Sequence, residues 1–193
     1  TSGTAVGCYH LHLPQTYPTF QEAATAAAAY TGGFPAWIDG TYYVRVGAYL
    51  DSASAQAAQT ALGLTTATVV GTSGAGVSVV KTGTNSILFQ FDSTSGLFLA
   101  VKPGLDDTVK SQTHFRGGIY YGAFQYRRSG GNLTVINVLP MDDYIQGVIV
   151  QEMSPSWPLE ALKAQAVCAR SYAYGKIQAG KHQGMGFDLC NTV

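Results

Sequence analysis

The sequence has little charge. Lysine, arginine, aspartate and glutamate make up 11% of its 193 residues, against the roughly 25% that is typical of soluble domains. Basic and acidic residues balance to a formal net charge of +0. Such a chain has no basic field with which to hold nucleic acid or an anionic membrane, so we expect no nucleic-acid partner. Its 23 glycines and 12 tyrosines, with many serines and threonines, suit an extracellular setting and neutral ligands such as sugars.

Long hydrophobic runs and an initiator methionine are also missing. The longest apolar stretches fall well short of the roughly 18 residues that a membrane span requires. The chain begins TSGTAVG, so we expect that a segment upstream has been removed, by processing or by the choice of sequence boundaries.

Cysteine is scarce. The chain has three cysteines, Cys8, Cys168 and Cys190, which cannot all pair with one another. Cys168 lies among alanines, and we expect it to be a small buried side chain. His10 and His12 have no third ligand nearby in the sequence, so no metal site is predicted from them.

Turn residues and hydrophobic patterning divide the chain into two parts. The first part repeats a strand–helix–strand pattern of about 33 residues, and the stretch GTSGAG, residues 71–76, then interrupts it like a linker. The second part is rich in short alternating runs and ends in what reads as a strand, a turn and one long helix. The sequence therefore predicts an α+β protein with domains at 1–73 and 74–193. The first part comprises strands at 8–14, 33–40, 41–51 and 66–72 with helices at 19–32 and 52–63; the second has strands at 77–80, 87–91, 97–101, 119–126 and 133–140.

Strand alternation suggests a binding face in the first part. Alternate residues of a strand point to opposite faces of a sheet. If Val44, Val46 and the leucines near residue 11 face the helices, five polar or aromatic side chains share the open face. Aromatic rings and planar donors on such a face suit a neutral glycan, although a merely solvated face fits the same pattern. The five residues are His10, His12, Tyr43, Arg45 and Tyr49.

The first part resembles a SPOR domain over residues 5–72. The resemblance rests on YYVRVGAYLDSASAQAAQTAL, which matches the family's strand, its V-x-V-G turn and the alanine-led helix that follows. It implies a ferredoxin-like βαββαβ module that binds peptidoglycan glycan strands stripped of their peptides. Arg45 stands where the family often has glutamine.

The second part resembles the SpoIID/LytB family, named for stage II sporulation protein D and the amidase enhancer. FRGGI fits the family's Y-R-G stretch, and LTVINVLPMDDYIQGVIVQEMSPSWPLEALKAQAVCARSYAYG follows its long motif with few departures. Asp142, Cys168 and Ser171 replace the usual glutamate, alanine and threonine, and none of these is the motif's acid, Glu152. Family members that are enzymes are lytic transglycosylases acting on denuded glycan, and others are described as amidase enhancers.

The resemblance implies catalytic roles for Glu152, Lys163 and Arg170. We expect Glu152 at a strand end just before a helix, with Ser154 or Ser156 as the helix N-cap. Lys163 and Arg170 would lie on one helix face, about 10 Å apart along its axis, orienting Glu152 and binding sugar oxygens. The alternative is that the two cations simply pair with Glu160 or Asp188.

A single acid fits this sequence better than a pair. Ordinary glycosidases use two carboxylates about 5 to 9.5 Å apart. An extended strand would separate Asp142 and Asp143 from Glu152 by roughly 30 Å. A lytic transglycosylase needs only one, because the muramyl 6-hydroxyl is the nucleophile. One glutamate can protonate the leaving oxygen and then take the hydroxyl proton.

The resemblances together predict a lytic transglycosylase for peptide-free peptidoglycan. The alternative is a non-catalytic peptidoglycan-binding protein or amidase enhancer, with an amidase as partner. We expect an extracytoplasmic protein in the cell wall or at the outer membrane face, exported or anchored upstream of residue 1. No cofactor is required. A zinc site using Cys190 would need chain beyond Val193, where family members continue, so residues 74–193 are expected to be an incomplete, and in isolation inactive, catalytic domain.

Overall fold

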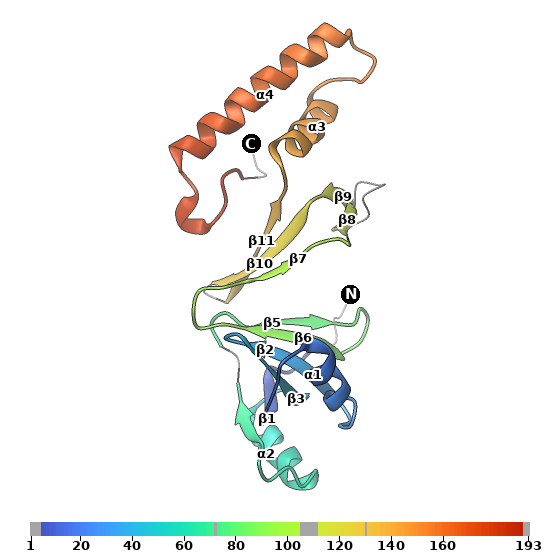
Figure 1. Cartoon of the computed structure of the whole chain (residues 1–193), viewed down its shortest axis with the longest axis vertical. Helices are drawn as coiled ribbons and strands as arrows, with labels where there is room; N and C mark the ends of the chain where they lie inside the picture. Colours follow the sequence, from blue (N-terminus) through green and yellow to red (C-terminus); the bar gives the residue numbers. More distant parts are fainter. Residues whose placement is uncertain (1–4, 72, 105–111, 130, 191–193) are drawn as a thin grey trace. The chain divides into compact units, whose positions relative to one another are not determined.

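The computed structural model describes residues 5–71, 73–104, 112–129 and 131–190, and it is mixed α+β as predicted (Figure 1). The chain divides into two compact units. The N-terminal unit comprises residues 1–99 with 126–134, and the C-terminal unit comprises residues 100–125 with 135–193.

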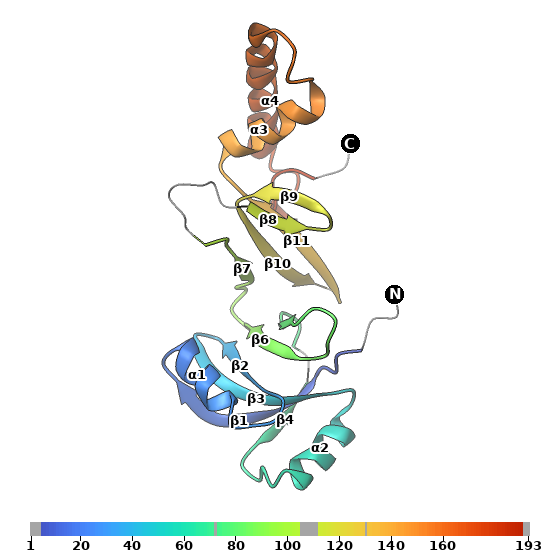
Figure 2. The same cartoon turned by 90° about the vertical axis from the view of Figure 1, so that its right-hand side faces the viewer.

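The N-terminal unit begins with six elements that follow the predicted order. The structure confirms a strand, a helix, two strands, a helix and a strand, and Figure 2 shows both helices against the sheet. Helix α1 ends earlier than predicted, before the Tyr30–Gly33 turn. The six elements are β1 (Tyr9–Tyr17), α1 (Phe20–Ala27), β2 (Gly33–Ile38), β3 (Thr41–Tyr49), α2 (Ser52–Ala61) and β4 (Thr68–Val70).

Helices α1 and α2 pack on one face of this sheet. Leu11, Val44 and Val46 are almost completely buried there, and they meet Ala27 of α1 and Ala55 of α2. The alanines allow the helices to approach the strands closely, because they add little volume between backbone and sheet. This is the apolar face that strand alternation predicted.

Asp51 is the N-cap residue of helix α2. The Asp51 carboxylate accepts a hydrogen bond from the Ser54 backbone N–H at 2.7 Å. The Ser54 hydroxyl in turn accepts from the Asp51 N–H at 3.4 Å, which completes a capping box. Ser54 is therefore the third helical residue, and the acid before it takes the cap position.

The sheet continues past the predicted boundary at residue 73. Strand β6 (Ile87–Asp92) pairs in parallel with β2, and β5 (Val77–Val80) pairs with β6, so the full order is β4-β1-β3-β2-β6-β5. In a four-stranded sheet β2 would be an edge with unpaired backbone groups, and β6 satisfies them. The GTSGAG stretch is therefore a connection inside the N-terminal unit.

Further strands precede the two C-terminal helices. A three-stranded sheet has the order β11-β10-β7, and β8 pairs with β9. Phe115, Tyr120 and Phe124 of this region form an aromatic cluster with ring centroids 5.2 to 6.4 Å apart. Strand β8 was not predicted. The strands are β7 (Leu99–Val101), β8 (Gln112–Phe115), β9 (Gly118–Tyr121), β10 (Ala123–Ser129) and β11 (Asn132–Val138).

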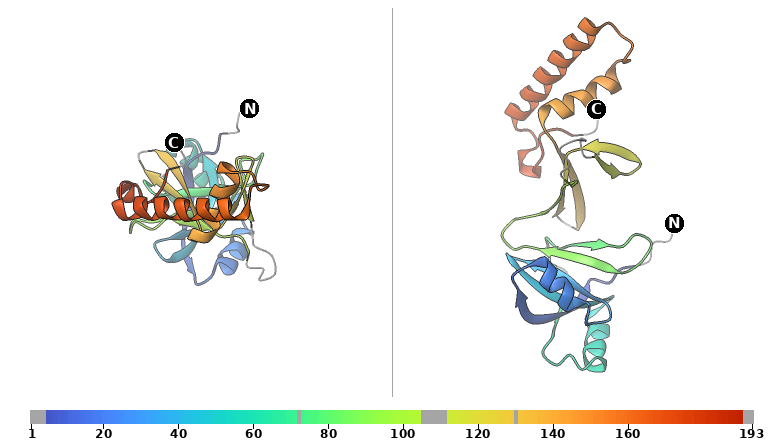
Figure 3. Two further views of the ribbon diagram at one scale, coloured as in Figure 1. Left: turned by 90° about the horizontal axis from the view of Figure 1, so that it is seen from above. Right: turned by 45° about the vertical axis from the view of Figure 1, so that its right-hand side comes forward.

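The apolar run before Glu152 is helical, so the predicted strand there is wrong. Helix α3 (Met141–Glu152) runs beside α4 (Leu159–Ala179), as Figures 1 and 3 show. Ile145 of α3 is buried, and Val148 and Ile149 follow it at helical spacing. A short β-branched run is ambiguous in sequence because a buried helix and a strand can carry the same residues.

Helix α4 also differs from the sequence prediction at two points. Pro158 occupies its N-cap position without a side-chain hydrogen bond, while Ser154 and Ser156 bond each other at 2.8 Å. Cys168 is exposed, and Ala173 is the buried residue of this helix. Five residues turn a helix by about 140° beyond one full turn, so these two side chains face different directions.

Candidate functional site

The predicted acid, Glu152, is the last residue of helix α3 and is exposed. The chain turns directly after it, because Met153 has extended backbone angles. Within the described ranges no hydrogen bond or ion pair engages the Glu152 carboxylate. The carboxylate is therefore accessible to a substrate that approaches this helix end.

The two predicted cations of α4 pair with other acids. Lys163 donates to Glu160 at 2.8 Å, one helical turn away, which was one of the alternatives considered. Arg170 pairs with Asp142 in the first turn of α3, and both side chains stay more than half exposed. Among the described contacts, none joins Glu152 to either cation, so the structure does not bring the three residues together through a hydrogen bond or ion pair.

The helical form of residues 141–152 changes the separation of the carboxylates. Asp142 lies ten residues before Glu152, which corresponds to about 15 Å along a helix axis rather than roughly 30 Å along a strand. Asp143 lies about 14 Å away by the same measure. Both axial separations still exceed the 5 to 9.5 Å of paired glycosidase acids. Neither residue therefore sits within its helix as a second acid for Glu152.

The predicted open sheet face is not open at His10 and Arg45. Both side chains are buried, with 1% and 6% of their surface exposed. Gln90 of β6 covers them: its amide nitrogen lies 3.1 Å from His10 Nε2, and its oxygen accepts a hydrogen bond from Arg45 Nη1. The face is closed because the chain after residue 73 returns to this sheet. His12 and Tyr43, which the same prediction placed here, are half-buried, with ring centroids 4.8 Å apart.

Tyr49 lies on the opposite face from the one predicted. It packs against the helix-side core, together with Tyr9 and other half-buried side chains. The register shifts between the β1–β3 pairs Tyr9–Tyr49 and Leu11–Val46, so β3 carries one extra residue there. Gly47 lies in that interval with φ 77. A one-residue bulge inverts the alternation beyond it, which simple strand parity cannot anticipate.

Hydrogen bonds define the state of His10. Its Nδ1 lies 2.7 Å from the carbonyl oxygen of Gly47, so the ring donates there, and Nε2 accepts from the Gln90 amide. Burial lowers the pKa of His10, the Gly47 hydrogen bond acts in the opposite direction, and the charge of Arg45 lowers it further. The ring is therefore neutral near pH 7 and keeps one defined tautomer.

A polar cavity of about 410 Å³ lies around this buried group, which we call the sheet cavity. Its walls come from the N-terminal unit alone. Asp92 accepts a hydrogen bond from Ser73 Oγ, and Arg128 donates to the carbonyl oxygens of Ser73 and Gly76 at 3.1 and 3.4 Å. The cavity is lined by Val6, Gly7, Cys8, His10, Arg45, Gly71, Ser73, Gly76, Ser78, Val80, Gln90, Asp92 and Arg128.

Sequence reasoning missed the part of this cavity that comes after residue 73. Gln90 is a buried amide in the middle of the apolar strand ILFQFD, and that contrast was the available sign that β6 carries a polar site. Asp92, at the end of the same strand, is also buried. Arg128 had no such local sign, because only the tertiary structure brings it to Ser73.

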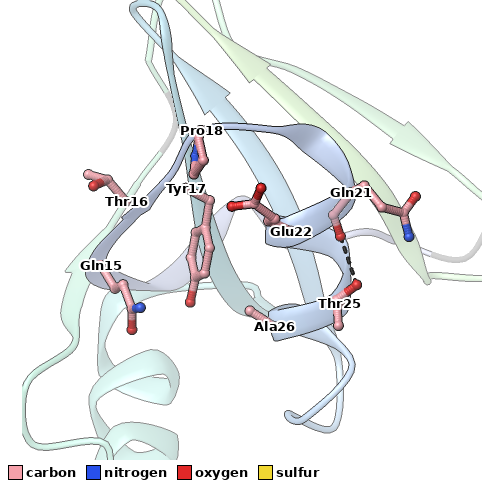
Figure 4. Close-up of a pocket in the computed structure, with 8 residues that line it drawn as sticks. All are labelled: Gln15, Thr16, Tyr17, Pro18, Gln21, Glu22, Thr25 and Ala26. Carbon is pink, nitrogen blue, oxygen red and sulfur yellow. Dashed lines mark hydrogen bonds between the residues drawn. The ribbon is translucent and has the colours of Figure 1, made fainter.

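A second hollow lies beside helix α1 (Figure 4). It is an open groove of about 500 Å³ whose wall includes Tyr17, Gln21 and Glu22. Burial raises the pKa of the Tyr17 phenol, with Tyr30 as a smaller cause. The polar side chains here are exposed, and the hydrogen bond drawn joins Thr25 to the Gln21 carbonyl within the helix. The groove therefore shows no buried polar group directed at a ligand.

The described residues include no cluster of three or more histidine, cysteine or acidic side chains that could hold a metal ion. His182 stacks on Phe187 with ring centroids 4.8 Å apart. Cys190 is exposed. Helices in the part of the chain that the structure covers are too short or too polar to cross a membrane.

Comparison with known proteins finds similarity to parts of this chain. An uncharacterized protein of Brachyspira hyodysenteriae is 45% identical over 74 residues, which cover 38% of this chain and 20% of that protein. The chain thus aligns with about a fifth of the length of this relative. No solved structure matches the chain. Residues 129–193 match the family model described as SpoIID, stage II sporulation protein, and this similarity supports a role connected with sporulation or the cell wall.

Proposed function

We propose that this protein cleaves peptidoglycan glycan strands that lack stem peptides, as a lytic transglycosylase with Glu152 as general acid and base. The observation that carries the proposal is the position of Glu152. It is an exposed carboxylate at the end of a helix, without a partner in the described ranges, inside the segment similar to SpoIID.

The chemistry requires only this one acid. Glu152 in its protonated form gives its proton to the glycosidic oxygen as the bond to the anomeric carbon breaks. The 6-hydroxyl of the same muramyl residue forms the new bond to that carbon. Its proton passes to the Glu152 carboxylate, which restores the acid and leaves a 1,6-anhydro end. The axial separation of Glu152 from Asp142 and Asp143 supports a mechanism without a second carboxylate.

Lys163 and Arg170 are proposed to assist by binding sugar oxygens near Glu152. Both are exposed on α4 and held by surface ion pairs. Exposed pairs of this kind are worth only about 0.2–1 kcal/mol, so a substrate can displace them.

The N-terminal unit is proposed to be a SPOR-type, ferredoxin-like module that holds the glycan. Its support is the β-α-β-β-α-β order together with the sheet order β4-β1-β3-β2. His10, His12, Tyr43 and Arg45 remain the proposed binding residues, with His10 and Arg45 acting from the sheet cavity. Tyr49 is not among them, because it packs on the helix side of the sheet.

A non-catalytic role, as a glycan-binding protein or amidase enhancer, is the second candidate. The observation that favours it is that both cations of the proposed active site are occupied by Glu160 and Asp142. In that case the protein would bind glycan and deliver or activate an amidase. We propose an extracytoplasmic location for either role, because the glycan is there.

Mass spectrometry of denuded glycan incubated with the complete protein separates the two candidates. The parent protein is expected to produce 1,6-anhydro ends, and Glu152→Gln is expected to abolish them while binding persists. Asp188→Asn is the matched control, because it removes an exposed carboxylate that pairs with neither Lys163 nor Arg170 among the described contacts. Undiminished anhydro product from Glu152→Gln would contradict the catalytic assignment, and no product from the parent protein would favour the amidase-enhancer role.

A further inference from the structure

The bend between strands β9 and β10 lies very close to the end of β11. Gly122 is the residue of this bend and has φ 82, and a Cβ atom there would come within 2.3 Å of the Val138 carbonyl oxygen. The same atom would lie 2.7 Å from Cβ of Leu139. Glycine is needed here, because it accepts both the left-handed conformation and the close approach of a second backbone. The bend and the end of β11 therefore form one close-packed junction within the C-terminal unit.

The side chain of Asn137, on β11, holds this junction together. Its amide nitrogen donates to the carbonyl oxygen of Tyr121 at 2.9 Å and to that of Ala123 at 3.1 Å, so the two hydrogen bonds lie on either side of Gly122. A primary amide has two N–H groups, and both are used here. The side chain is half-buried. Asn137 therefore fixes the orientation of the end of β11 against the bend.

Helix α3 begins directly after this junction. Leu139 and Pro140 alone separate β11 from Met141, the first residue of α3, and β11 leads straight into the helix (Figure 1). The ring of Pro140 fixes its φ, which is -59, and it also restricts the backbone of the residue before it. The link is therefore stiff, and the direction of β11 at Asn137 sets the direction in which α3 leaves the strands.

A small change of that direction becomes large at the far end of the helix. The 12 residues of α3 span about 18 Å, and Glu152 is the last of them. A tilt of about 10° at the start of the helix would move this end by about 3 Å. Catalytic groups need to lie within roughly 0.5 Å of their productive position, and a displacement of about 1 Å can lower a rate about 100-fold. The position of the Glu152 carboxylate therefore depends on the angle of α3.

We propose that Asn137 is a positioning residue for Glu152: its two hydrogen bonds to the β9–β10 bend set the angle at which α3 leaves the strands. The consequence for catalysis rests on the proposed function, whereas the effect on the angle of α3 rests on the hydrogen bonds alone. Asn137 acts through the helix and not through the substrate. Its loss is therefore expected to lower kcat and to leave KM nearly unchanged.

Kinetics of the complete protein on denuded glycan test the catalytic consequence. Asn137→Asp keeps the shape of the side chain but replaces two N–H donors by a carboxylate that faces two carbonyl oxygens. At pH 7, kcat for the formation of 1,6-anhydro ends is expected to fall about 100-fold per folded molecule, with KM within about threefold of the parental value. Asn132→Asp is the matched control, because Asn132 is exposed at the other end of β11, and it is expected to match the parent. Parental kcat in Asn137→Asp would overturn the proposal.

The pH profile of this variant separates positioning from a purely structural role. The two carbonyl oxygens favour the protonated form of the introduced carboxyl group, so its pKa is expected to lie above the ordinary value of about 3.9. In that form the group can donate one of the two lost hydrogen bonds. The ratio of variant to parental kcat is therefore expected to rise at least about fivefold between pH 7 and pH 5. A ratio that stays constant over this interval would contradict the proposal.

A distance measurement tests the angle of α3 without any activity. Spin labels at Ile119→Cys on β9 and Val150→Cys on α3, both exposed positions of the C-terminal unit, report where the helix lies relative to the strands once the native cysteines are replaced by serine. The parent is expected to give one narrow distance, and Asn137→Asp a distribution that is shifted or broadened by about 3 Å. An unchanged distribution would refute the positioning role.

The two measurements keep this inference apart from the proposed function. If the parent protein forms no 1,6-anhydro ends, transglycosylase activity is refuted, and the spin-label distance alone decides whether Asn137 sets the angle of α3. If Asn137→Asp fails to fold, Asn137→Leu takes its place in both experiments, because it removes the donors without adding a charge. Product formation at the parental rate by the folded variant would refute this inference alone.

Discussion

Replacing Gln90 with leucine is expected to destabilise the N-terminal unit strongly. Gln90 is 7% exposed and makes three side-chain contacts: its oxygen accepts from Arg45, and its nitrogen lies 3.1 Å from His10 Nε2 and 3.0 Å from Ser78 Oγ. Leucine fills a similar volume but leaves the buried groups of Arg45 and His10 without this partner. At about 1–3 kcal/mol for each unsatisfied group, the free energy of unfolding should fall by about 2–6 kcal/mol. That is a large share of the roughly 5–15 kcal/mol available to a domain.

Tryptophan fluorescence in urea measures this loss. The chain has two tryptophans, and Trp37 stacks on Phe91 at 5.1 Å within the N-terminal unit. A Trp157→Phe background therefore makes the signal report on this unit. The urea midpoint of the Gln90→Leu variant is expected to fall by about 1–3 M.

A matched control lies on the same strand. Leu88 of β6 is 51% exposed, so Leu88→Ala is expected to change stability by no more than about 0.5 kcal/mol. If Gln90→Leu behaves like Leu88→Ala, then Gln90 does not satisfy buried groups. The account of a closed polar face would then be wrong.

Four further predictions concern the pH dependence of stability and substitutions at Gly47, Asp142 and Arg170. Burial lowers the pKa of His10 and of His12 below the ordinary 6.5, so the unfolded chain takes up protons before the folded chain as the pH falls. Urea midpoints are therefore expected to be constant above about pH 6.5 and to decline below it. A midpoint that does not change with pH would contradict this prediction. Gly47→Ala places a side chain at φ 77, with its Cβ 2.4 Å from the Tyr49 ring, and should cost at least about 1–2 kcal/mol of stability in thermal unfolding. Asp142→Asn removes an exposed ion pair and should lower the free energy of unfolding by less than about 1 kcal/mol. Arg170→Lys should lose most glycan cleavage while the protein stays folded. If this variant cleaves glycan at the parental rate, Arg170 is only an ion-pair residue.

Local patterning was sufficient for the first six elements. Alternation in β1 and β3 identified the face that packs on the helices, and alanine-rich segments identified the helices themselves. These features depend on neighbours within a few residues, so a sequence carries them directly. The sequence motif around Glu152 was also recognisable without a structure, and the family model matches residues 129–193, which contain this motif. The motif did not reveal that residues 141–152 are helical, because β-branched apolar runs occur in both helices and strands.

The tertiary structure determined which side chains cover each face of the sheet and which charged side chains pair. Strand β6 pairs with β2 from more than fifty residues along the chain, and this closes Gln90 over His10 and Arg45. One extra residue in β3 moves Tyr49 to the helix side of the sheet. Strand parity states only that two residues face the same or opposite ways, and it holds no information on bulges or distant partners. The sequence by itself determined the local alternation of side chains in each strand. Long-range strand pairing determined that His10 and Arg45 of the predicted glycan face are buried beside a polar cavity.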